Sequence, residues 1–173
     1  VVLKGGEEIH ATKAVISNLN AKNIPDLVGA NNVPERYARN LKNLKLSAFR
    51  GFSQGYALHD IPEYTAGGEI NESFFVEFAT SPYEKFLRIF DDMEYGYPSV
   101  EIPASSCQTA LDPTRAPEGK HTLDLFHYIP YDLAEGGAAR WDEIREEIAD
   151  GILATLQKHT TNMGSDNIIG RAI

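Results

Sequence analysis

Hydrophobic and polar residues alternate along three stretches of the chain, and each alternation predicts a strand. The stretches are residues 45–59, which mix aromatic and small side chains, residues 73–78 (SFFVEF), and residues 121–131 (HTLDLFHYIPY). Aromatic and β-branched residues at a two-residue period are typical of strands. Gly51 and Gly55 interrupt the first stretch and indicate β-bulges or a close approach of backbone.

The start of the chain predicts a hairpin. Gly5 and Gly6 supply the positive φ angles that a tight turn needs. The second arm ends in AVIS (residues 14–17), an apolar run that suits a strand buried on both faces.

Helical spacing of apolar residues recurs in four other segments, which are residues 23–30, 33–44, 81–96 and 141–159. In the third segment Ser81 and Glu84 form a capping-box pattern, and Tyr83 and Leu87 belong to its apolar stripe. In the fourth, Gly151 interrupts the amphipathic helix and indicates a close packing contact.

The order of these elements favours an α+β fold with an antiparallel or mixed sheet covered by helices. Strands and helices do not alternate regularly, which argues against a doubly wound parallel sheet. The length of 173 residues suits one domain with a sizeable core, and 42% apolar and 24% charged residues are ordinary for a globular protein.

Charge and cysteine content narrow the function classes. With 16 basic and 25 acidic residues the net charge is -9, which argues against nucleic acid as the partner, although residues 36–50 hold five basic residues and no acid. Cys107 is the sole cysteine, so an internal disulfide is impossible and a reducing compartment such as the cytoplasm fits. No run approaches the roughly 18 apolar residues of a membrane span.

The sequence holds no catalytic set that can be recognised from its residues. His121 and His127 share one face of a predicted strand but lie about 20 Å apart along it, too far for one metal ion. Cys107 has no basic neighbour and reads as a structural thiol. Nucleophile elbows, phosphate-binding loops and dinucleotide-binding glycine motifs are absent. No catalytic residue and no metal ligand is therefore predicted.

One turn-and-strand segment carries a resemblance to a known family. Residues 112–131 (DPTRAPEGKHTLDLFHYIPY) resemble the pattern Asp-Pro-small-x-Ala-Pro-x-Gly, a strand and Pro, found in phytoene desaturase-like proteins of the amine oxidase superfamily of FAD-dependent oxidoreductases. The matching residues are Asp112, Pro113, Ala116, Pro117, Gly119 and Pro130. Four further segments resemble the family in the same order: residues 5–18, 91–106, 141–160 and 167–173.

The resemblance implies the middle, substrate-binding part of such a flavoprotein. The family's FAD-binding glycine motifs are missing, and apolar runs at both ends favour a piece of a longer chain. Residues 1–20 would then be a stub of the FAD-binding domain, residues 21–164 the substrate-binding domain, and residues 165–173 the return to the FAD-binding domain. The expected function is hydride transfer from an apolar substrate to FAD, with the isolated chain inactive and unable to bind FAD tightly.

The resemblance also suggests which residues meet the ligands. Ser17 and Asn18 would lie near FAD, because they end the strand that leads out of the FAD-binding domain. The residues expected to line the substrate cavity are Phe49, Phe52, Tyr56, Leu125 and His127, with core packing as the alternative role. Contact with a membrane surface is compatible with a lipid substrate. The alternative function is a non-catalytic module that binds an apolar ligand or a protein partner.

Overall fold

A computed structural model describes the whole chain, residues 1–173, apart from the side chain of Ala30. The chain forms two units, Val1–Leu46 and Ser47–Ile173. The predicted assignment of residues 1–20 and 165–173 to an FAD-binding domain stays a prediction.

The first unit begins with a turn that confirms only the tip of the predicted hairpin. Val2 and Glu8 form an antiparallel bridge, and Gly6 has a φ of 85°. The continuation through residues 9–16 is irregular, and Ile16 is 96% exposed. The expectation of a strand buried on both faces is therefore wrong in this chain, since two arms that pair at a single bridge make no sheet for it to enter.

Two short α-helices complete the first unit and confirm the predicted helical segments. They are α1 (Ile24–Val28), with a proline in its first turn, and α2 (Glu35–Lys42). Two 3-10 turns accompany them, η1 (Ala21–Asn23) and η2 (Ala30–Asn32).

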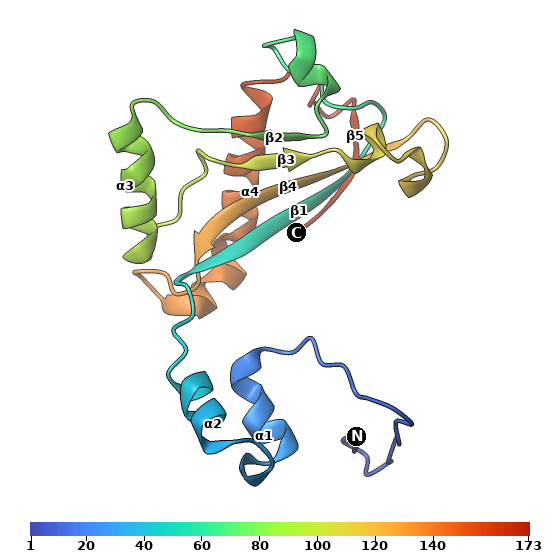
Figure 1. Cartoon of the computed structure of the whole chain (residues 1–173). Coiled ribbons are helices and arrows are strands. Elements are labelled where there is room, and N and C mark those ends of the chain that lie inside the picture. The colour runs from blue at the N-terminus through green and yellow to red at the C-terminus, as the bar shows by residue number, and fades with distance from the viewer. The chain divides into compact units, whose positions relative to one another are not determined.

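The second unit is built on a five-stranded sheet in which all neighbours are antiparallel (Figure 1). Its strands are β1 (Phe49–Leu58), β2 (Phe75–Glu77), β3 (Ala104–Ser106), β4 (His121–Pro130) and β5 (Ile168–Ala172), in the order β2-β3-β4-β1-β5. The long central pair β1–β4 runs without a break from Phe49–Pro130 to Leu58–His121. The predicted α+β class with an antiparallel sheet is confirmed.

Helix α4 (Trp141–Gln157) lies behind the sheet in Figure 1 and makes the core with it. Ala149, Ile152 and Leu156 are fully buried among the sheet residues. A Cβ at Gly151 would lie 2.9 Å from Cγ1 of Val100, so the predicted close contact at this glycine is confirmed.

Helix α3 (Tyr83–Glu94) differs from its sequence prediction at its start and on its buried side. Pro82 occupies the N-cap position, so the capping box predicted from Ser81 is wrong. The helix buries Ile89 and Met93 while Tyr83 stays exposed. The remaining short helices of this unit are the 3-10 turns η3 (Gly68–Glu72), η4 (Gln108–Ala110), η5 (Pro113–Arg115) and η6 (Gly137–Arg140).

The turn before β4 is held by local hydrogen bonds. The Asp112 carboxylate accepts from the backbone N–H of Thr114 at 3.2 Å and from its hydroxyl at 2.6 Å. These two bonds lower the pKa of Asp112, since they favour its charged form. Gly119 then reverses the chain with a φ of 68°, and Lys120 leads into the strand. As expected, a stiff polar turn sets the start of an apolar strand.

Candidate functional site

The two faces of the β1–β4 pair differ in what covers them. Side chains alternate between the faces along each strand, and every second residue of β1 from Phe52 and of β4 from Leu123 is buried. We call the side against α4 the covered face. Its residues in the central pair are Phe52, Gln54, Tyr56, Leu58, Leu123, Leu125, His127 and Ile129.

We call the opposite side the open face, and its centre is a floor of very small residues. In β1 it presents Gly51, Ser53, Gly55 and Ala57, and in β5 it presents Gly170 and Ala172, which pair with Ala57 and Gly55. A Cβ at Gly55 or Gly170 would meet no atom within 4 Å. Backbone is therefore exposed here to any flat or extended molecule that lies against the sheet.

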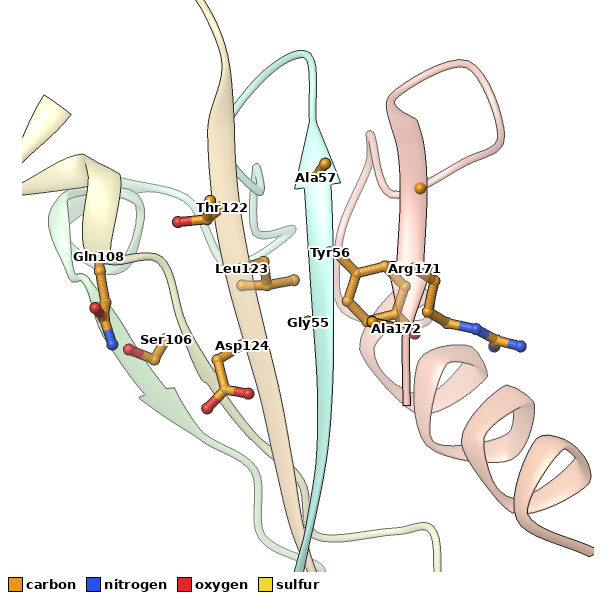
Figure 2. A pocket seen from close by; sticks show the side chains of 11 residues that line it. Gly55, Tyr56, Ala57, Ser106, Gln108, Thr122, Leu123, Asp124, Arg171 and Ala172 are labelled. Carbon is orange, nitrogen blue, oxygen red and sulfur yellow. The ribbon is translucent and has the colours of Figure 1, made fainter. Parts of the chain in front are cut away.

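Polar side chains border this floor on the β4 and β3 side. Figure 2 shows Thr122, Asp124, Ser106 and Gln108 on that side, with Asp124 pointing away from Gly55. Asp124 and Ser106 are paired residues of the two strands. These groups and the part of the floor made by Gly55, Ala57, Gly170 and Ala172 line a hollow of about 510 Å³.

A second hollow of about 280 Å³ lies where α3 meets the sheet, and it is aromatic. Its ring-bearing lining residues are Phe75, Phe78, Phe86, Phe90, Phe126, His127 and Tyr128. Phe126 and Tyr128 stack edge to face with ring centroids 5.0 Å apart, and Phe86 meets Phe90 in the same way at 5.2 Å. Apolar clefts with few polar groups are typical sites for small molecules.

The structure divides the predicted substrate-binding residues between the faces. Phe52, Tyr56 and Leu125 belong to the core on the covered face, which is the alternative role of core packing. Of these residues only Phe49 lies at a strand position that faces the open side, and its ring centroid lies 5.8 Å from that of Phe90. Their contact with a substrate stays a prediction.

His127 is buried with both ring nitrogens occupied. Its Nδ1 donates to the carbonyl oxygen of Tyr128, and its Nε2 accepts from the backbone N–H of Ile102 at 3.3 Å. Burial lowers the pKa of this imidazole, because desolvation disfavours its charged form. The two hydrogen bonds fit a neutral imidazole, and contact of His127 with a substrate stays a prediction.

Tyr56 carries a second buried polar group on the covered face. Its hydroxyl donates to Oε1 of Gln54 at 2.6 Å, and burial raises the pKa of the phenol. The hydrogen bond and the raised pKa favour a protonated phenol that packs in the core.

The residues predicted to approach FAD lie in the first unit. Ser17 and Asn18 are exposed and outside regular secondary structure, and the Ser17 hydroxyl accepts from the backbone N–H of Leu19 at 3.3 Å. Their role at a cofactor stays a prediction.

The described residues contain no metal-binding cluster, no helix able to span a membrane, and one buried cysteine. Within that part of the chain, no group of three or more His, Cys, Asp or Glu side chains is arranged to hold a metal ion. None of the described helices is long and apolar enough to cross a membrane. Cys107 is buried, with its Sγ 3.6 Å from the hydroxyl of Thr109.

Comparison with known proteins gives a partial relationship. The chain is 34% identical over 87 residues to the rat (Rattus norvegicus) protein "Pyridine nucleotide-disulfide oxidoreductase domain-containing protein 2". The match covers 49% of this chain and 14% of that protein, so the chain spans a small part of its relative. No protein-family model matches the chain, and no solved structure matches it. The chain thus has a coarse kinship with oxidoreductases.

The sequence contained a signal for the open face in its small residues, which are easily overlooked beside the large apolar ones. In residues 51–57 (GFSQGYA) the small residues Gly51, Ser53, Gly55 and Ala57 alternate with larger ones. Large apolar residues attract attention as ligand contacts, yet in a sheet covered on one side they belong to the core. The alternating small residues were the better guide to the accessible face.

Proposed function

We infer that this chain is the substrate-binding portion of an FAD-dependent oxidoreductase of the desaturase or dehydrogenase type. The observation that carries the proposal is the open face of the sheet. The floor of small residues and the aromatic hollow follow one another along the β1–β4 pair on this face. The coarse kinship with an oxidoreductase domain protein and the resemblance of residues 112–131 to phytoene desaturase-like proteins support it.

The residues of the chain suit the substrate better than the cofactor. A Cβ would fill the space above Gly55 and Gly170, so the glycines there leave room for an apolar molecule to lie flat on backbone. FAD needs backbone N–H groups for its pyrophosphate, which glycine-rich loops commonly provide, and the sequence has no such motif. In this proposal residues outside this chain hold most of FAD, and Ser17 and Asn18 lie at its edge.

The division of labour follows from the chemistry of such enzymes. When bound, the flavin would supply the acceptor for a hydride taken from a C–H bond of the substrate, while the neighbouring carbon or nitrogen loses a proton and the C–C or C–N bond becomes double. The chain's residues would bind and orient the substrate, the floor at Gly55 by close contact and Phe126 with Tyr128 by stacking. Their apolar surface would also exclude water.

The proposal is tested by expressing the complete gene that encodes this chain. The purified protein is expected to show the visible absorption spectrum of bound flavin. A Gly55→Leu variant is expected to keep its flavin and its melting temperature while losing flavin reduction by apolar substrates. A folded full-length protein that takes up no flavin, even with FAD added, would overturn the proposal and favour the alternative of a non-catalytic binding module.

A further inference from the structure

A lysine and a histidine stand together at one end of the open face. His59 follows the last residue of β1 and Lys120 precedes the first residue of β4, so they come directly after the Leu58–His121 pair. Lys120 Nζ lies 2.8 Å from Nδ1 of His59. A lysine ammonium only donates hydrogen bonds, so the imidazole nitrogen accepts this one.

Strand parity puts this pair in line with the floor. His59 continues the β1 series Gly55 and Ala57, and Lys120 continues the β4 series Asp124 and Thr122. Ala57 and Thr122 both line the larger hollow, and the pair stands about 7 Å further along the strands. The turn that ends at Gly119 holds the lysine at this point: Lys120 donates its backbone N–H to the carbonyl oxygen of Pro117 at 2.9 Å.

The open face therefore changes in character along its length. The cationic pair stands at one end, the small residues form the middle, and Phe126 and Tyr128 stand in the aromatic hollow at the other end. The distance from the row of Lys120 to the row of Phe126 is about 20 Å. A molecule that matches this order is elongated and apolar, with a negative charge at one end only.

Charge on the face also sets the direction in which such a molecule would lie. Asp124 stands at the middle of the face and would repel an anion there. Lys120, which is half-buried, gives an anion a favourable position at the end of the floor. Outside the basic stretch of residues 36–50, the net charge of -9 makes the rest of the chain unattractive to anions.

We propose that the open face binds an elongated apolar molecule through an anionic end group, a carboxylate or a phosphate, placed against Lys120 and His59. The apolar chain lies over Gly55 and Ala57 and ends among the rings around Phe126. This inference rests on the proposed function, since it gives the class of substrate for the same face.

The test compares ligands of equal length with and without the charge. Dodecanoate, dodecyl phosphate and 1-dodecanol are titrated separately into the chain by calorimetry, below the micelle concentrations of the two anions and the solubility limit of the alcohol. One of the two anions is expected to bind about fivefold more tightly than the alcohol. A hydrogen bond to a charged group at a partly exposed site increases the affinity by about this factor. Whichever anion binds more tightly identifies the end group.

Variants distinguish the contribution of the anchor, which is the pair Lys120 and His59, from that of the rest of the open face. Lys120→Gln should remove the preference for the anion and leave the binding of 1-dodecanol unchanged. Lys158→Gln, which removes the same charge from the exposed end of α4, should keep the preference. Gly55→Leu should weaken all three ligands, and thermal unfolding of each variant establishes that it is folded.

Two results would overturn the inference in distinguishable ways. If the anions and the alcohol bind equally well and Lys120→Gln changes nothing, the anionic anchor is wrong; a loss of binding in Gly55→Leu would still support the open face as an apolar site. If none of the three ligands binds the folded chain, both the anchor and the substrate-binding role of the face are wrong.

Discussion

The two faces of the β1–β4 pair come from the same strands, yet they carry opposite kinds of residue. The covered face has large apolar side chains that are almost fully buried, such as Leu125 at 0% exposure. On β1 the open face has Gly51, Ser53, Gly55 and Ala57, which would contribute little to any core. One face therefore stabilises the fold, and the other is free to be shaped by a ligand. Substitutions on the two faces should separate stability from binding.

The largest expected effect is a loss of stability on the covered face. Leu125→Ala removes a fully buried side chain and should lower the free energy of unfolding by about 2–5 kcal/mol. Urea unfolding followed by circular dichroism measures it. Thr122→Ala on the open face of the same strand is the matched control and should change stability by about 0.5 kcal/mol or less. Similar costs for the two variants would contradict the division between the faces.

A pair of glycines sharpens the comparison within the open face. A Cβ at Gly51 would lie 2.7 Å from Cε2 of Phe126, whereas at Gly55 it would meet no atom within 4 Å. Gly51→Ala should therefore cost about 1–3 kcal/mol of unfolding free energy through overpacking. Gly55→Ala should be neutral or stabilise the chain by up to about 1 kcal/mol, since it restricts the unfolded state.

A double variant isolates the cause. Adding Phe126→Leu, whose side chain is shorter than the ring, should recover most of the stability that Gly51→Ala loses. If the Gly51→Ala cost persists in that background, the clash with the ring is not its origin.

The pattern of residues predicted most of the second unit, because each of its elements has a periodic signal and a distinct end. The strand at residues 121–131 and the helix from Trp141 formed nearly as expected. The N-terminal strand did not form, because its apolar run at Val15 and Ile16 signals burial without saying which partner provides it. The local pattern of residues predicts whether a segment is a helix or a strand. Whether that segment is buried depends on another part of the chain packing against it.

The candidate site was harder to predict, since it depends on which face the helix covers. Alternation puts Tyr56 and Gly55 on opposite faces, but it does not say which face α4 will cover. The pair His59–Lys120 could not be expected either, because it forms only through the register of two strands far apart in sequence.

A pH-dependent prediction tests the covered face through His127. Burial lowers the pKa of this imidazole, so the unfolded chain binds a proton near pH 6.5 that the folded chain resists. The stability that the neutral His127 side chain contributes is fully present above pH 6.5. As the pH falls below that value, the free energy of unfolding decreases by up to about 1.4 kcal/mol per pH unit. Urea unfolding at a series of pH values from 7.5 to 5.5 should show a steeper fall for the unmodified chain than for His127→Gln.

The control for this slope is an exposed histidine. His10 is 87% exposed in its side chain, and His10→Gln should leave the dependence on pH unchanged. If the two variants have the same slope as the unmodified chain, His127 does not carry the effect.

The smallest expected effect compares the loss of one hydroxyl on each face. The Tyr64 hydroxyl lies 2.6 Å from Oγ of Ser105, which is fully buried on the covered side of β3. Tyr64→Phe should cost about 1 kcal/mol of unfolding free energy, since it leaves a buried hydroxyl without its best partner. Ser53→Ala removes an exposed hydroxyl from the open face and should change stability by about 0.5 kcal/mol or less. Because water can replace a lost partner only where it has access, equal costs for the two changes would mean that Ser105 is hydrated, and that the covered face is less closed than its burial indicates.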